Sequence, residues 1–190
     1  MSAGSQGADG GPWLLVIDPQ RIFADQASEW GSPMFADAIP EITRLAEAFA
    51  GRTIVTRWVP GDEHPGSWGP YFERWTFADR PDDDPLFHLV PEAVGLTDRP
   101  TLDVTTFGKY GPELTAITGE HPQLVLTGVA TDCCVIATAL AATDAGATVT
   151  VVKDACAGST AENHAAALTV MGLYEPQMTV RTTDEVLGDL

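Results

Sequence analysis

The amino-acid sequence predicts an α/β protein in which a mostly parallel sheet carries helices on both of its faces. Short apolar runs alternate with segments of helical spacing along most of the chain, which is the pattern of strands joined by crossover helices. The run Leu124-Val125-Leu126 is continuous rather than alternating, as expected for a strand that is buried on both faces. We find no internal repeat and no sign of a second domain.

Periodicity places each element in chain order. Strands are expected at residues 13–18, 52–57, 101–105, 123–127, 148–153 and 178–181, and helices at 33–50, 111–118, 131–145, 160–172 and 183–188. The helix at 33–50 is supported by apolar side chains at Ile39, Ile42, Leu45, Ala46 and Phe49. Residues 58 to about 86 have no clear periodicity and are expected to be irregular.

Length and composition favour one domain and exclude several classes of protein. With 190 residues, 44% of them hydrophobic, the chain can bury one sizeable core. We assign residues 12–190 to a single domain and residues 1–11 to a flexible tail. No apolar stretch approaches the roughly 20 residues of a membrane span. The net charge of −17 disfavours binding to nucleic acid or anionic lipid, and three cysteines, two of them adjacent, suit a cytoplasmic protein with reduced thiols.

Cys134 is the strongest candidate for a catalytic residue. It lies where the strand at 123–127 has ended and a helix begins. Backbone N–H groups and the positive end of the helix dipole favour a thiolate there, so we expect the pKa of this thiol to be lowered. The same N–H groups can hold an oxyanion. The alternative is that Cys134 is a buried core residue, as free cysteines often are.

Asp18 follows the end of another expected strand. Ligands of open parallel sheets bind at the carboxyl ends of the strands, near the point where the strand order switches. One crevice can therefore hold both Asp18 and Cys134.

Three motifs carry a resemblance to a known family. They are Leu14-Leu15-Val16-Ile17-Asp18-Pro19-Gln20, then Lys109 after the third strand, then Gly128-Val129-Ala130-Thr131-Asp132-Cys133-Cys134-Val135 followed by Thr138-Ala139 and Asp144-Ala145-Gly146. In this order and spacing, the chain from Trp13 to about Ala157 resembles the isochorismatase-like cysteine hydrolases, which include nicotinamidases and N-carbamoylsarcosine amidases. The resemblance implies a three-layer α/β/α fold with a six-stranded, doubly wound, parallel sheet. It also implies a catalytic triad of Asp18, Lys109 and Cys134, and a cis peptide before Ala130, whose N–H joins that of Cys134 in an oxyanion hole.

These residue types suit acyl transfer without a histidine. A carboxylate can take the thiol proton, an ammonium favours negative charge, and the sulfur attacks a carbonyl. Taken singly, Asp18 can be a helix N-cap and Lys109 a solvated loop charge. Cys133 is the rival nucleophile, but the family's cysteine directly precedes the valine. Cys156 is expected to be a small buried residue.

A metal site is not expected. Asp62-Glu63-His64 resembles the metal-binding motif of nicotinamidases, but that motif should begin at Trp58, and no second histidine follows before His88. A zinc site needs at least three protein ligands. We therefore expect no metal and no other cofactor.

Aromatic residues gather in the irregular stretch after the second strand. Trp58, Trp68, Tyr71, Phe72 and Trp75 either wall a substrate pocket or pack the loop and a subunit interface. We name Phe23, Trp58, Trp68 and Tyr71 as pocket candidates.

The sequence therefore predicts a metal-independent cysteine hydrolase that cleaves a C–N amide-type bond of a small molecule, in a homodimer or larger homo-oligomer. A metal-containing nicotinamidase, a vinyl-ether hydrolase of the isochorismatase type and a non-catalytic binding module of the same fold stay open as alternatives.

Overall fold

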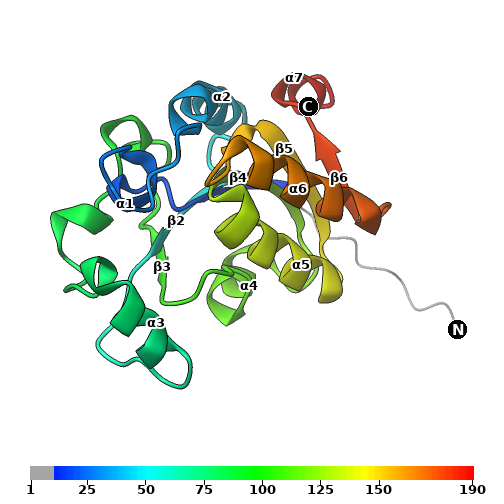
Figure 1. The fold of residues 1–190 in the computed structure, drawn as a ribbon. Coiled ribbons are helices and arrows are strands. Elements are labelled where there is room, and N and C mark those ends of the chain that lie inside the picture. Colours follow the sequence, from blue (N-terminus) through cyan, green and yellow to red (C-terminus); the bar gives the residue numbers. More distant parts are fainter. Residues whose placement is uncertain (1–10) are drawn as a thin grey trace, which may run out of the picture.

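Six parallel strands form the centre of the computed structural model, which describes residues 11–190. The expected tail at 1–11 lies, apart from Gly11, outside the described residues. The strands stand in the order β3-β2-β1-β4-β5-β6 (Figure 1). Their bounds are β1 Trp13–Ile17, β2 Thr53–Trp58, β3 Leu102–Val104, β4 Gln123–Val129, β5 Thr148–Ala157 and β6 Met178–Arg181. The expected doubly wound sheet is confirmed.

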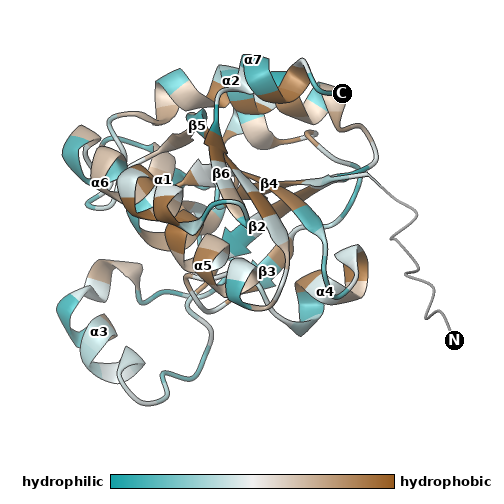
Figure 2. Ribbon diagram, turned by 90° about the vertical axis from the view of Figure 1, so that its right-hand side faces the viewer, coloured by the Kyte–Doolittle hydropathy of each residue, from teal (hydrophilic) through white to brown (hydrophobic). Residues whose placement is uncertain are grey.

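Helices cover both faces of this sheet. On one face lie α2 (Phe35–Ala48) and α7 (Thr183–Leu187), and on the other α4 (Pro112–Thr118), α5 (Ile136–Asp144) and α6 (Ala161–Met171) (Figure 1). Side chains alternate along β1: Leu14 and Val16 pack with α2, whereas Leu15 and Ile17 pack with α4, α5 and α6. Because both faces are covered, every one of these positions is apolar. The same result is visible in Figure 2, where strands of high hydropathy lie inside helices that are more polar.

Two parts of the chain differ from the sequence prediction. The stretch expected to be irregular contains α3 (Trp68–Arg74) and 3₁₀ turns at Thr76–Ala78 and Pro85–Phe87. The segment with α3 projects from the body of the fold (Figures 1 and 2). No side chain caps α3, and the helix is only 7 residues long. The local sequence therefore gives weak signals for a helix here, and aromatic packing stabilises it. The helix expected at 131–145 opens with a π-helical turn, Thr131–Val135, before α5 begins.

Further short elements complete the chain. These are α1 (Arg21–Ala24) and 3₁₀ turns at Pro91–Ala93 and Gly172–Tyr174. Within residues 11–190, no helix combines the length and apolar character that crossing a bilayer requires.

The strand order reverses between β1 and β4, which lie side by side at the centre of the sheet. The chain leaves β1 at Asp18 and leaves β4 at Ala130. This switch point is where open α/β sheets bind ligands. The topology therefore brings the two most informative sequence motifs to one place.

Gly128 makes this close approach possible. Its φ is +109°, and a Cβ at this position would overlap the carbonyl oxygen of Ile17 on the neighbouring strand. We expect Gly128→Ala to lower the free energy of unfolding by at least about 1–3 kcal/mol, because backbone must move to admit the methyl group. Urea unfolding measures this.

The matched control is Gly172→Ala. Gly172 has a helical φ of −64°, and its Cβ would meet nothing within 4 Å. This substitution should leave stability unchanged or raise it by up to about 1 kcal/mol. Equal effects of the two substitutions would contradict the role given to Gly128.

Candidate active site

A buried ion pair lies at the end of β1. Asp18 adopts the left-handed backbone region, with φ 48°, and its side chain is fully buried. Asparagine and aspartate tolerate this region better than most residues. The Asp18 N–H donates to Thr56 Oγ1 at 3.1 Å, and the Thr56 hydroxyl donates to Asp18 Oδ1 at 2.6 Å. The neighbouring strand β2 thus fixes both the backbone and one oxygen of Asp18.

Lys109 supplies the other half of the pair. Its Nζ lies 2.9 Å from Asp18 Oδ2, and both side chains are completely shielded from solvent. The ammonium donates to the carbonyl oxygen of Thr106 at 2.8 Å. Among the described residues, no donor approaches Oδ2 with the angles of a hydrogen bond, so the contact with Lys109 is an ion pair only. Oδ2 therefore keeps a lone pair that can accept a proton.

Thr138 connects this pair to the cysteine turn. The Lys109 N–H donates to Thr138 Oγ1 at 2.9 Å, and the Thr138 hydroxyl donates to the carbonyl oxygen of Cys134 at 2.7 Å. Thr138 is fully buried on α5, one turn beyond Cys134. One hydroxyl therefore sets the position of two of the predicted catalytic residues.

Cys134 lies in the π-helical turn that follows β4, and it is 2% exposed. The Val129–Ala130 peptide bond is cis, as the resemblance implies. The Ala130 carbonyl accepts the N–H groups of Cys133 and Val135, both at 3.0 Å. The N–H of Cys134, which lies between them, is not bonded to that carbonyl, as far as the described residues show.

Cys134 opens onto a cavity of about 220 Å³. Four aromatic rings line it: Phe23, Trp30, Tyr71 and Phe107. The remaining lining comes from Glu29 and Gly31, from Ala130, Asp132 and Cys133 in the turn after β4, and from Ser159 after β5. The cavity is smaller than the 300–1,000 Å³ typical of sites for drug-sized ligands, so it suits a small molecule.

Only part of the sequence-predicted pocket lines this cavity. Phe23 and Tyr71 do, whereas Trp58 and Trp68 do not. Trp58 is fully buried behind Trp30, at a centroid distance of 5.6 Å, because it stands on β2 inside the fold. Trp68 packs on the side of Tyr71, 5.3 Å away. Trp30 and Phe107 also line the cavity, and the sequence pattern predicts neither of them. Phe107 had one usable signal, its place two residues before Lys109.

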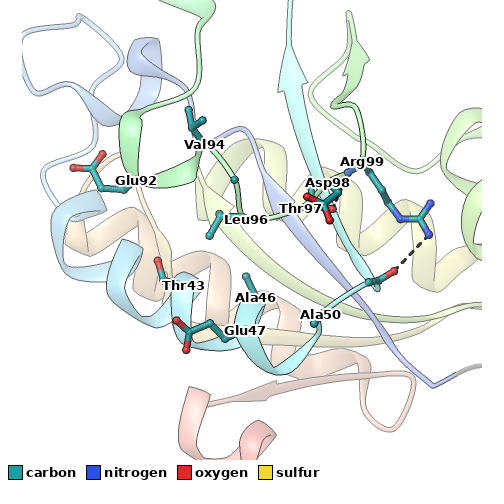
Figure 3. A pocket seen from close by; sticks show the side chains of 12 residues that line it. Thr43, Ala46, Glu47, Ala50, Glu92, Val94, Leu96, Thr97, Asp98 and Arg99 are labelled. Carbon is teal, nitrogen blue, oxygen red and sulfur yellow. Dashed lines mark hydrogen bonds between the residues drawn. The ribbon is translucent and has the colours of Figure 1, made fainter.

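A larger hollow of about 640 Å³ lies between α2 and residues 92–99 (Figure 3). Arg99 lies at its edge and donates to the carbonyl oxygen of Gly51 at 3.4 Å (Figure 3). Neither cysteine nor histidine lines it. Because Gly51 precedes β2, this hollow lies toward the amino ends of the strands, away from the switch point. The smaller cavity is therefore the candidate active site.

Comparison with protein families identifies the family of the chain. The Isochorismatase domain matches residues 12–185 of the chain. The chain belongs to the isochorismatase family. Members of this family are hydrolases, so the resemblance noted in the sequence is confirmed. A comparison with curated proteins found no match.

Solved structures show the same fold. The chain is similar to a cysteine hydrolase from Pseudomonas syringae, with a TM-score of 0.78 and 17% identity over 93% of this chain and 91% of that one. It is similar to N-carbamoylsarcosine amidase from Thermoplasma acidophilum, with a TM-score of 0.70 and 19% identity over 92% and 98% of the two chains. MAR1 ribonuclease from Caenorhabditis elegans gives a TM-score of 0.70 and 21% identity over 93% and 79%. These likenesses establish the isochorismatase-like fold.

The nicotinamidase-type metal motif does not fit the residues present. Within residues 11–190, no three His, Cys, Asp or Glu side chains are grouped closely enough to bind a metal ion. His64 stacks on Phe72 with a centroid distance of 4.0 Å, and its Nε2 lies 3.5 Å from Asp79 Oδ1. Trp58, at the position where the motif should begin, is apolar and buried.

The pKa of Cys134 departs from the sequence prediction in direction. The neighbouring Cys133 and burial both raise the pKa of the Cys134 thiol, and the charge of Asp18 adds to this. Lys109 lowers it, but by less, because Asp18 lies beside Lys109. The proximity of Cys134 lowers the pKa of the Cys133 thiol. Cys134 is therefore a neutral thiol at rest.

Alkylation should consequently reach Cys133 first. Cys133 is partly exposed and has the lower pKa, whereas Cys134 is buried and protonated. Burial also raises the pKa of Cys156, which should react last. We expect iodoacetamide at pH 7.5 to modify Cys133 several-fold faster than Cys134, as followed by peptide mass spectrometry. Faster modification of Cys134 would mean that the turn lowers its pKa, as the sequence suggested.

Thr138 offers a test of the connection between Lys109 and Cys134. Thr138→Val keeps the shape but removes both hydrogen bonds, leaving a buried N–H and a buried carbonyl without a partner. We expect the free energy of unfolding to fall by about 1–3 kcal/mol. Thr138→Ser, which retains the hydroxyl, should recover most of this loss in urea unfolding. A valine variant as stable as the wild type would show that Thr138 does not hold the site together.

Proposed function

We propose that this protein is a metal-independent cysteine hydrolase that cleaves a C–N amide-type bond of a small molecule. The observation that carries the proposal is the buried Asp18–Lys109 ion pair linked through Thr138 to a thiol that opens onto a small cavity. Membership of a family of hydrolases supports it, as does the likeness to an amidase.

In the proposed reaction, Cys134 Sγ attacks the amide carbonyl carbon while its proton passes to Asp18 Oδ2. The new oxyanion accepts hydrogen bonds from the N–H groups of Ala130 and Cys134. Asp18 then gives the proton to the nitrogen as the C–N bond breaks, and the amine leaves. A thioester on Cys134 remains.

Water completes the reaction. Asp18 takes a proton from a water molecule that attacks the thioester, and the C–S bond then breaks to release the acid. Asp18 returns the proton to the departing sulfur, which restores both the carboxylate and the thiol. Lys109 stabilises the carboxylate form of Asp18 between these steps, since its Nζ lies 2.9 Å from Oδ2. Each turnover consumes one water molecule and yields one acid and one amine or ammonia. Because no atom changes its oxidation state, the reaction needs no oxidant.

Other activities fit the site less well. A vinyl-ether hydrolase has no use for the thiol. A nicotinamidase-type enzyme needs metal ligands that the region around His64 does not offer. Ribonuclease activity, which the name of one structural relative suggests, requires a polyanion to approach a chain of net charge −17.

Ammonia release from a panel of small primary amides, in the presence of EDTA, tests the proposal. Cys134→Ser should lower kcat/KM by about a thousandfold or more, since the hydroxyl is a far weaker nucleophile with this base. This variant leaves the ion pair intact, so its folding is expected to be normal. Asp18→Asn should lower kcat/KM on the order of a hundredfold or more. The folding of this variant must be checked, because the substitution leaves Lys109 without its counter-charge.

Cys133→Ser is the matched control and should retain hydrolysis. Fragment-ion mass spectrometry of the wild type mixed with a slow amide should place the acyl group on Cys134 and not on the adjacent Cys133. Activity that is lost in EDTA and restored by zinc, iron or manganese would instead support the nicotinamidase-type alternative. Full activity of Cys134→Ser would rule out the thioester mechanism.

A further inference from the structure

The lining of the cavity carries negative charge that no positively charged side chain of the described lining residues neutralises. Its lining includes Glu29 and Asp132, but no lysine, arginine or histidine among the described residues. Lys109 lies nearby, but its charge is matched by Asp18 at 2.9 Å. A substrate in this cavity therefore meets an excess of carboxylate.

Asp132 lines the cavity, and Ser159 holds its carboxylate in place. Its Oδ1 accepts the N–H of Ser159 at 2.7 Å and its Oδ2 accepts the Ser159 hydroxyl at 2.6 Å. These neutral donors fix the carboxylate without neutralising it. The nearest imidazole, His164, is bonded through Nδ1 to Thr131 Oγ1, and burial lowers its pKa, so it is uncharged at neutral pH.

Glu29 adds a second carboxylate at the edge of the cavity. It is exposed and forms no ion pair within residues 11–190. Arg21 and Arg80 line a neighbouring hollow that Glu29 also borders. Arg80 is engaged with Asp84 at 3.4 Å and with the carbonyl oxygen of Phe77 at 2.7 Å. Asp132 is therefore the stronger determinant, and Glu29 the weaker one.

The aromatic rings present a second feature suited to positive charge. Phe23 and Trp30 are parallel, with centroids 6.1 Å apart, and Tyr71 lies edge-on to Phe107 at 5.6 Å. The face of an aromatic ring attracts ammonium and guanidinium groups. Burial raises the pKa of Tyr71, so its phenol stays neutral over the physiological range.

This wall is formed before any ligand binds. Trp30 packs against five other rings: Phe23, Trp58, Tyr71, Trp75 and Phe77. The Ser32 hydroxyl, two residues on, donates to the carbonyl oxygen of Gly158 at 2.5 Å and joins the Trp30 loop to the Ser159 side. A wall of fixed rings loses little conformational entropy when it binds a ligand.

We propose that the cavity selects small cationic amides, whose ammonium or quaternary nitrogen lies between Asp132 and the aromatic rings while the amide carbonyl meets Cys134. This inference rests on the proposed function, because it names the substrate class of that same site. The volume of about 220 Å³ limits the substrate to a short chain between the cation and the carbonyl. Glu29 and the net charge of −17 favour the approach of such a molecule.

The test uses amides that differ in charge but not in shape. Betaine amide (N,N,N-trimethylglycinamide) carries a positive charge, and 3,3-dimethylbutanamide is its neutral isostere. Succinamate supplies an anion of similar size. We expect kcat/KM for the cation to exceed that for the neutral isostere by roughly tenfold or more and that for the anion by roughly a hundredfold. Asp132→Asn should bring the cation-to-neutral ratio close to one. Asp144→Asn, the same charge change on α5 outside the cavity, should leave the ratio as it is.

Calorimetric binding to the Cys134→Ser variant separates the two proposals. Calorimetry measures the affinity of each of the three amides, and so the preference for charge, even if the wild type hydrolyses none of them. Tighter binding of the cation, without turnover by the wild type, would support the substrate class and contradict the amidase mechanism. Hydrolysis of all three amides with equal kcat/KM, tighter binding of the neutral or anionic amide, or no binding of the cation would overturn the cationic preference.

Discussion

The rest of the site depends on the ion pair between Asp18 and Lys109. Two charged side chains without any solvent contact are tolerated only when they lie in contact and their other atoms are satisfied. Here Thr56 on β2 holds one oxygen of Asp18, and the Thr106 carbonyl and Thr138 hold Lys109 from the other side. Loss of either partner would leave an unpaired buried charge, at a cost of about 3–5 kcal/mol. The pair therefore fixes the loop after β3 against the end of β1, and through Thr138 it fixes the turn after β4.

In the proposed mechanism, the same arrangement allows a buried thiol to act as a nucleophile. In an enclosed site, a thiolate at Cys134 beside the carboxylate of Asp18 would place two negative charges together, and burial accordingly keeps the thiol protonated. The ammonium of Lys109 makes a charged carboxylate acceptable in the same place. In the proposed mechanism, negative charge therefore rests on Asp18 before the reaction, and it moves to the Cys134 sulfur and then to the substrate oxygen only as the reaction proceeds. In that mechanism, the N–H groups of Ala130 and Cys134 stabilise the charge that arrives on the substrate oxygen.

The sequence was most informative where local chemistry decides structure. Continuous apolar runs located the strands, and the motif around Cys134 together with Asp18 located the switch point, because residues just beyond parallel strands meet at one edge. The walls of the cavity were less predictable. Trp30 reaches it from a loop that is anchored by Ser32 to Gly158, 126 residues further along the chain, and no local pattern reports such a contact. Trp58 looked like a pocket residue, but β2 carries it into the interior. The direction of the Cys134 pKa depends on burial, which the helix-end argument did not include.

The two proposals share one electrostatic argument. If the substrate is cationic, its charge lies beside the thiol at the moment when the Cys134 proton moves to Asp18. The bound cation then opposes the effect of Asp18 on the Cys134 sulfur, and it stabilises both the developing thiolate and the oxyanion that follows. Substrate binding would supply the positive charge that the described residues of the cavity lining lack. Under both proposals, a neutral thiol at rest would protect the free protein from unproductive reaction, because the sulfur would become strongly nucleophilic only when a ligand of the right charge fills the cavity.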